Sequence, residues 1–219
     1  MPRYYPIFLD IEGKPCLVVG GGEVAERKVM SLLEHGAKVR VISPRLVDGL
    51  LKLQQSGEVT VESREYRKGD VDGSVLAIAA TDDNELNAQV AREAVRANIA
   101  VNVVDDPEKS TFIVPSLFKR GGISIAISTG GKSPALAKRI RIALERLLPE
   151  ELGELADMLS GVRNELKSRG ISVDKETWQD ALDMDSLLDL LRQGKPGEAR
   201  ERIMWRLEGQ RPTTHQKRG

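Results

Sequence analysis

The stretch Gly20-Gly21-Gly22-Glu23-Val24-Ala25 decides the fold, because it fits the pattern G-x-G-x-x-A. The short apolar run 15–19 directly precedes it and is typical of a buried strand. The segment 23–35 follows with apolar residues at helical spacing and stops at Gly36. In such a strand–loop–helix unit, the first glycine allows a tight turn, the second lets a pyrophosphate approach the backbone, and Ala25 keeps helix and strand close. The stretch therefore predicts dinucleotide binding; the alternative is a plain glycine turn in a ligand-free α/β fold.

Strand and helix patterns alternate around this loop. Short connections join them, which predicts an α/β, Rossmann-like doubly wound parallel sheet. We expect strands at 15–19, 38–42, 59–61, 75–80 and 100–104, and helices at 23–35, 46–55 and 84–98.

The pattern changes after residue 107. Segments 110–114 and 123–128 read as strands, 134–148 as a helix, and apolar residues recur at helical spacing from residue 150 onward. We therefore predict a Rossmann domain at 1–108, a small α+β segment at 109–149, a helical domain at 150–209 and a polar tail at 210–219.

Composition excludes several classes of protein. The chain has 219 residues, with 33 Lys plus Arg and 33 Asp plus Glu, and a net charge of zero argues against a bulk nucleic-acid binder. One cysteine and two distant histidines, His35 and His215, argue against a disulfide or a permanent metal site. No apolar run is long enough for a membrane span, and none near the amino terminus resembles a signal peptide. We expect a cytoplasmic protein.

The end of the second predicted strand departs from the dinucleotide-binding pattern. An Asp or Glu is expected there to hold a ribose hydroxyl, but the chain has Ser43 and Pro44. Arg40 or Arg45 could meet a 2′-phosphate, so the stretch leaves the choice between NAD and NADP open.

Four stretches together carry a resemblance to a known family. The chain resembles the dehydrogenase module of siroheme synthases and the free-standing precorrin-2 dehydrogenases over roughly residues 3 to 149. It is too short to hold the methyltransferase module of the fused forms, so we expect the free-standing form. The matching stretches are Gly20 to Lys28, Ala79 to Asp83, Asn102 to Asp105 and Ser128 to Pro134.

The resemblance implies NAD-dependent oxidation of precorrin-2 to sirohydrochlorin by a homodimer, and in some members ferrous iron insertion. It assigns catalysis to Asp105, which could also offer oxygen to iron during chelation. The segment 109–149 would serve dimerisation and substrate binding. The cofactor-binding residues that we expect are Gly20, Gly22, Glu23, Val24, Ser43, Pro44, Thr81 and Asn102.

Asp105 also has a simpler interpretation. It lies at the carboxyl end of a predicted strand, where ligands of open α/β sheets bind. However, Asp105 or Asp106 could instead cap the turn before Pro107.

The segment 109–146 is strongly basic, with eight Lys and Arg side chains and a single acid, Glu145. A tetrapyrrole that carries many carboxylates would suit it, whereas a solvated helix face is the alternative. Within it we expect Ser128, Lys132 and Ser133 to bind substrate. Ser133 also fits the N-cap of a helix that begins at Pro134, which would be a purely structural role.

Two other functions remain open from the residues. An NAD-sensing regulatory domain would have the same loop, but usually keeps the acid after the second strand. A hydroxy-acid dehydrogenase would normally need a catalytic His or Lys in the second half of the fold, and no suitable His is present.

Overall fold

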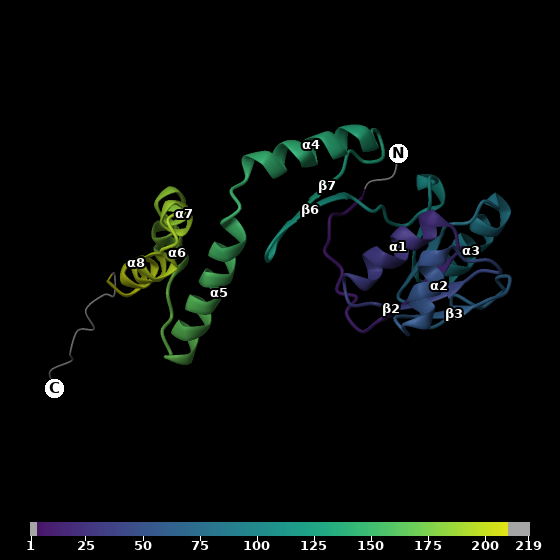
Figure 1. Ribbon diagram of the computed structural model, residues 1–219, viewed down its shortest axis with the longest axis horizontal. Coiled ribbons are helices and arrows are strands. Elements are labelled where there is room, and N and C mark those ends of the chain that lie inside the picture. The colour runs from purple at the N-terminus through teal and green to yellow at the C-terminus, as the bar shows by residue number, and fades with distance from the viewer. Residues whose placement is uncertain (1–3, 210–219) are drawn as a thin grey trace. The chain divides into compact units, whose positions relative to one another are not determined.

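The computed structural model describes residues 4–209, and in it a parallel sheet forms the first half of the chain (Figure 1). Five strands lie in the order β3-β2-β1-β4-β5, and β1 pairs with both β2 and β4. The predicted doubly wound α/β arrangement is confirmed. The strands are β1 (Pro15–Val19), β2 (Lys38–Ile42), β3 (Val59–Glu62), β4 (Leu76–Ala79) and β5 (Ala100–Val103).

Helices cover both faces of this sheet. One face packs against α1 (Glu23–Leu33) and α2 (Asp48–Gln55), and the other packs against α3 (Asn84–Arg96). Alternate residues of a strand point to opposite faces, so Val18 joins the first cluster and Leu17 the second. The strands are apolar on both sides for this reason, as expected of a parallel sheet.

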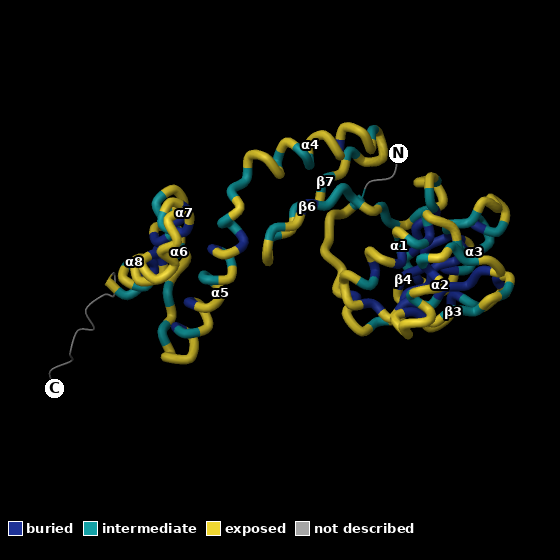
Figure 2. The backbone as a smooth tube through the Cα atoms, viewed as in Figure 1, coloured by how far each residue is buried: buried dark blue, intermediate teal, exposed yellow. Residues whose placement is uncertain are grey.

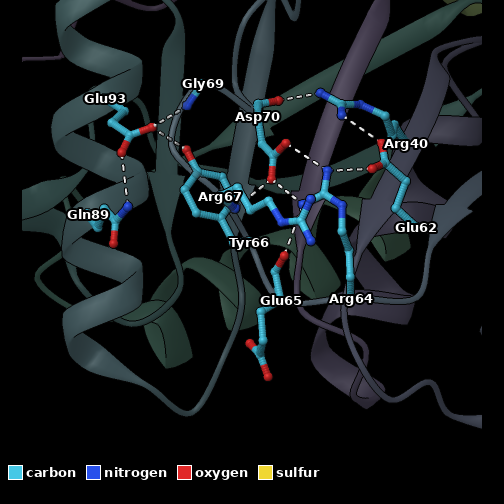
Figure 3. Close-up of polar contacts among 10 residues, drawn as sticks. All are labelled: Arg40, Glu62, Arg64, Glu65, Tyr66, Arg67, Gly69, Asp70, Gln89 and Glu93. Carbon is cyan, nitrogen blue, oxygen red and sulfur yellow. Dashed lines mark hydrogen bonds and ion pairs between the residues drawn. The ribbon is translucent and has the colours of Figure 1, made fainter.

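A loop instead of a helix connects β3 to β4 on the α3 face. Tyr66 and Val71 of this loop are buried in the cluster that α3 also joins. Arg64 pairs with Asp70 at 2.7 Å and with Glu62 of β3, as Figure 3 shows. These contacts hold the loop over the end of the sheet that lacks a covering helix.

The rest of the chain forms a second unit with its own core. Contacts divide the chain into residues up to Val114 with 130–132, and residues 115–129 with those from Ser133 onward. An antiparallel hairpin, β6 (Ser116–Arg120) and β7 (Ile123–Ile127), precedes the helices. The helices are α4 (Pro134–Leu147), α5 (Leu152–Ser168), α6 (Lys175–Ala181), α7 (Met184–Arg192) and α8 (Pro196–Gly209).

The helical region after residue 150 is confirmed, but the predicted strand at 110–114 is wrong. Hydroxyls compete there with a strand ladder: Ser110 Oγ accepts from Val103 N at 2.9 Å, and Thr111 Oγ1 accepts from Val101 N at 2.8 Å. The strand begins instead at Ser116. The short helix η1 (Pro107–Lys109) lies before this segment.

The other predicted elements agree with the structure to within about two residues at each end. The predicted polar tail lies outside the described residues, and the domain boundaries at 108 and 149 stay predictions. No helix between residues 4 and 209 is long and apolar enough to cross a membrane.

Candidate active site

The carboxyl ends of the parallel strands bring four predicted segments to one edge of the sheet. The glycine loop follows β1, Ser43 and Pro44 follow β2, Thr81 follows β4, and Asp105 follows β5. Segments separated by up to about 85 residues in the chain therefore meet at the edge where α/β proteins bind ligands.

The three glycines of the loop have different surroundings. Gly20 has φ +126° and a Cβ there would lie 2.2 Å from the carbonyl oxygen of Ala80. A Cβ on Gly21 would lie 1.9 Å from the carbonyl oxygen of Arg45. A Cβ on Gly22 would meet no protein atom within 4 Å. Protein packing thus requires the first two glycines, while Gly22 faces open space where a ligand can approach.

The amino terminus of α1 fits an anion. Gly22 is the N-cap residue and no side chain caps the helix, so no protein side chain there occupies the first-turn N–H groups. Glu23 is exposed and Val24 is half-buried at this end. The helix dipole adds partial positive charge, and these residues together fit the pyrophosphate of a dinucleotide. Direct contacts from Glu23 and Val24 to a cofactor stay a prediction.

Ser43 has a structural contact at the end of β2. It is buried, and its Oγ donates to the carbonyl oxygen of Arg45 at 2.7 Å, which shapes the turn around the exposed Pro44. Atoms of Ser43 and Arg45 lie against Gly21, so this turn forms one wall of the glycine loop. Their predicted cofactor contacts are not tested by this geometry.

Arg40 is engaged elsewhere. Its guanidinium pairs with Glu62 at 2.9 Å and donates to the carbonyl oxygen of Asp70 (Figure 3). A 2′-phosphate would have to replace this ion pair to reach Arg40. Of the two arginines that the sequence offers for a 2′-phosphate, the exposed Arg45 therefore has the fewer competing contacts.

Thr81 is held by a residue that the sequence analysis missed. The Oγ1 of Thr81 donates to Asn87 Oδ1 at 2.8 Å, and Asn87 Nδ2 returns a hydrogen bond to the Thr81 carbonyl oxygen at 2.8 Å. Asn87 is buried on α3. The sequence signal was its spacing: Asn87 lies three, four and seven residues before Val90, Ala91 and Ala94, and so falls on the apolar face of the helix. Asn87 makes Thr81 a rigid part of this edge.

Asn102 is buried on β5 and its amide already has a partner. Nδ2 donates to the carbonyl oxygen of Phe112 at 3.1 Å, which ties the segment after η1 to the strand. Asn102 thus has a structural contact of its own, and its predicted role toward the cofactor stays a prediction.

The two aspartates after β5 have separate roles. Asp106 Oδ1 accepts from Lys109 N at 3.2 Å and its carboxylate pairs with Lys109 Nζ, so Asp106 caps η1. Asp105 has φ +59°, a conformation that costs energy for a residue other than glycine. Within residues 4–209 its carboxylate accepts no hydrogen bond, so the turn-capping interpretation applies to Asp106 and leaves Asp105 available for chemistry.

Lys28 is a second residue whose role the sequence analysis missed, although it lies in a quoted stretch. It is half-buried on α1, and burial together with the charge of Arg27 lowers its pKa. The Asp105 carboxylate raises the pKa of Lys28 instead, because the two side chains are close enough for their charges to interact. Lys28 therefore places a positive charge near Asp105 at this edge of the sheet.

The predicted substrate loop is built around Ser133. Its Oγ accepts from Leu136 N at 3.2 Å and Pro134 is the first residue of α4, so the predicted N-cap is confirmed. Thr129 Oγ1 accepts from Ser133 N at 2.9 Å and closes the loop. Lys132 is exposed between these residues. Substrate contacts of Ser128, Lys132 and Ser133 stay predictions, and the geometry equally fits a structural cap.

Several cations of the basic segment are already paired. Lys109 pairs with Asp106, and Arg141 pairs with Glu145 at 2.7 Å. Arg120 donates to the carbonyl oxygens of Leu148 and Glu145 and lies 5.1 Å from the ring centroid of Phe118. The charge available for an anionic substrate is therefore smaller than the sequence count suggests.

The sheet, its glycine loop and the uncapped amino terminus of α1 define a dinucleotide-binding protein of the Rossmann class. The family described as "Putative NAD(P)-binding" matches residues 7–116, and the chain belongs to this family. A second family, described as "Sirohaem biosynthesis protein central", matches residues 120–147.

Named relatives agree with the resemblance that the sequence carries. The chain is 42% identical over 200 residues to siroheme synthase 1 of Aeromonas salmonicida, which covers 90% of this chain and 43% of that protein. It is 46% identical over 164 residues to a siroheme synthase of Methylobacillus flagellatus, which covers 75% of this chain and 35% of that protein. The chain thus spans less than half the length of these curated relatives.

A solved structure matches over a larger share of its own length. It is that of SirC, a precorrin-2 dehydrogenase, with a TM-score of 0.73 and 26% identity over 92% of this chain and 99% of that chain. The resemblance to siroheme synthases and precorrin-2 dehydrogenases is confirmed.

Proposed function

We propose that this chain oxidises precorrin-2 to sirohydrochlorin, with NAD as the acceptor of the hydride. One observation carries the proposal: the open approach at Gly22 and the carboxylate of Asp105 lie at the same edge of the sheet. The names of the relatives, siroheme synthase and precorrin-2 dehydrogenase, support the substrate class.

The residues at this edge of the sheet have separate roles toward NAD and the substrate. The backbone of Gly20 to Gly22 and the first turn of α1 would hold the pyrophosphate of NAD, and the turn at Ser43 and Pro44 would lie beside its ribose. The substrate loses a hydride and a proton overall. When bound, NAD supplies the site that receives the hydride. A carboxylate oxygen of Asp105 takes the proton, and Lys28 supplies a positive charge near that carboxylate.

The substrate's carboxylates need cations. Lys132 lies in a capped loop at the start of α4, and the backbone of that loop carries two glycines with positive φ, Gly130 and Gly131. We infer that Ser128, Lys132 and Ser133 bind a carboxylate edge of the tetrapyrrole. The exposed position of Lys132 and the second family match support this role.

A second copy of the chain is the partner that we propose. Leu136, Ile140 and Leu147 are spaced by four and seven residues on α4 and are 52%, 38% and 75% exposed. Figure 2 shows that much of α4 is exposed. An apolar helix stripe of this kind is suited to burial against another helix. Light scattering tests it: the chain is expected to have the mass of a dimer, and Ile140→Lys is expected to shift it toward the monomer.

The deciding experiment mixes the chain with precorrin-2 and NAD and follows the absorbance of NADH and of the oxidised tetrapyrrole together. Both signals should rise in equal amounts. NAD binding without turnover of precorrin-2 would favour an NAD-sensing regulatory domain. A parallel assay with hydroxy acids in place of precorrin-2 tests the hydroxy-acid dehydrogenase, which turnover there would favour. Adding ferrous iron to the same mixture tests iron insertion, with Asp105 as the oxygen donor that the resemblance implies. The predicted cytoplasmic location is a separate matter and stays a prediction.

A further inference from the structure

The second unit carries a groove of about 910 Å³ between the carboxyl-terminal half of α5, the following loop and α6. We name it the α5–α6 groove. Five large apolar side chains, of the kind usually buried in a core, form its apolar lining. They are Leu159, Leu166, Ile171, Val173 and Trp178.

Three cations border this apolar lining: Arg163, Lys167 and Lys175. All three are exposed, and within residues 4–209 none of them pairs with a carboxylate. No Asp or Glu among the described residues lines the groove.

These three cations are exceptional within the helical region. Residues 152–209 contain nine Lys and Arg side chains, and the six outside the groove all pair with a carboxylate. The paired six are Arg169, Arg192, Lys195, Arg200, Arg202 and Arg206. Among the acids close to the groove in sequence, Asp174 caps α6 through Thr177, and Glu165 pairs with Arg169 and Arg200. Glu176 follows Lys175 in the first turn of α6, is exposed, and pairs with no cation among the described residues. The three groove cations are therefore free of ion pairs within residues 4–209, whereas the other cations of this region are paired.

An occupant of this groove needs an apolar body and several negative charges at its edge. The indole of Trp178 suits a flat conjugated ring, and the three cations suit carboxylates. The last ten residues of the chain do not fit this description, since they contain three basic residues and no acid. Exposed apolar surface rimmed by charge marks a binding site more often than a free surface.

We propose that the α5–α6 groove binds a tetrapyrrole through its ring on Trp178 and its carboxylates on Arg163, Lys167 and Lys175. The identity of this ligand rests on the proposed function, because sirohydrochlorin, the product of the proposed reaction, is a conjugated ring with carboxylate side chains. The groove is a holding site: the residues that line it carry no step of the oxidation.

Tryptophan fluorescence tests this binding without any turnover. Trp178 and Trp205 are the two tryptophans, so full-length Trp205→Phe reports on Trp178 alone. Uroporphyrin, a stable porphyrin with carboxylates on every pyrrole ring, is the probe, and a free tryptophan amide corrects for its absorbance. Saturable quenching is expected, weakening as salt is added.

Charge reversal separates the groove from other binding positions. In the Trp205→Phe background, Arg163→Glu, Lys167→Glu and Lys175→Glu together should weaken quenching by about tenfold or more, since charge-assisted contacts are the strong ones. The matched control reverses Arg192, Lys195 and Arg202 to Glu, which makes the same change of charge outside the groove. Circular dichroism verifies helix content, and single Lys167→Gln serves if the triple variant fails to fold.

The outcomes are distinct. Equal quenching in the groove variant and the control would overturn the proposal, as would no quenching by uroporphyrin at all. The dehydrogenase assay on the same variants distinguishes the two proposals. If the groove variant loses quenching but keeps a normal kcat at saturating precorrin-2, the result supports a holding site. If no variant turns over precorrin-2, the proposed reaction is contradicted. If quenching still depends on the three cations in that case, the groove remains a tetrapyrrole site.

Discussion

Asp106 caps the turn that follows β5, and this leaves its neighbour Asp105 with a carboxylate that accepts no hydrogen bond within the described residues. Asp105 lies in the left-handed region, φ +59°, at the edge of the sheet where the glycine loop lies. Strained positions of this kind persist where the surrounding structure holds them, and they gather at functional sites. The pair therefore offers a direct contrast between Asp105, for which we propose a catalytic role, and the structural carboxylate of Asp106.

The first prediction uses this contrast. Asp105→Asn should lower kcat by about 10²–10⁴-fold, the usual contribution of a general base, with little change in Tm or NAD affinity. Asn tolerates the left-handed backbone, so the fold should survive. Asp106→Asn should lower Tm and leave the rate near that of the original chain. Steady-state kinetics and thermal melts on both variants measure this, and an early-melting but fully active Asp105→Asn would show a structural role.

The second prediction concerns the glycine loop. Gly22→Val should weaken NAD binding while the protein stays folded, because a Cβ at this position meets no protein atom within 4 Å and the side chain fills the approach to the backbone. Gly21→Ala is the contrast, since its Cβ would lie 1.9 Å from the carbonyl oxygen of Arg45 and must disturb the fold. Calorimetric titration with NAD and thermal melts distinguish the two. Unchanged NAD affinity in folded Gly22→Val would sink the assignment of the loop.

The third prediction concerns charge on the substrate side. If Lys132 and nearby cations hold carboxylates, the KM for precorrin-2 should rise steeply with salt, because exposed charges are screened over about 10 Å at 0.1 M salt. The KM for NAD should change less. Kinetics over a salt series measure both constants, and equal slopes for the two ligands would count against a substrate role for this segment.

The fourth prediction separates capping from substrate binding at Ser133. Ser133→Asp should keep Tm, because Asp is as good an N-cap as Ser, but should raise the KM for precorrin-2 by repelling its carboxylates. Ser133→Ala removes the cap that Leu136 N uses and should cost about 0.5–2 kcal/mol of stability. Kinetics and melts together decide: a normal KM in Ser133→Asp would make this residue a cap alone.

The fifth prediction concerns acid stability and the loop between β3 and β4. The Arg64 guanidinium lowers the pKa of Asp70 below its usual 3.8, although partial burial acts in the opposite direction. A carboxyl whose folded pKa is depressed stabilises the protein above its unfolded pKa, and that contribution disappears as pH falls through the folded pKa. Asp70→Asn should therefore be less stable at pH 7, with a difference that shrinks below pH 3.8. Urea unfolding at a series of pH values measures it, and a difference independent of pH would refute the electrostatic origin.

The sequence by itself determined the features that depend on neighbours in the chain. The alternation of apolar runs, the glycine loop and the Ser133 N-cap with Pro134 were all predictable, because periodicity and capping arise from residues within a few positions of each other. The same local information placed Asp105 at a strand end but could not say which of two adjacent aspartates caps the turn.

Only the tertiary structure decided the roles that depend on distant partners. Arg40 meets Glu62, 22 positions away, and is therefore engaged where the sequence left it available. Thr111 bonds Val101 across ten positions and turns a predicted strand into a loop. The three groove cations are distinguished only by having no partner among the described residues, while similar side chains nearby have one. Such pairings follow from how the chain packs, and spacing along the sequence carries no direct record of them.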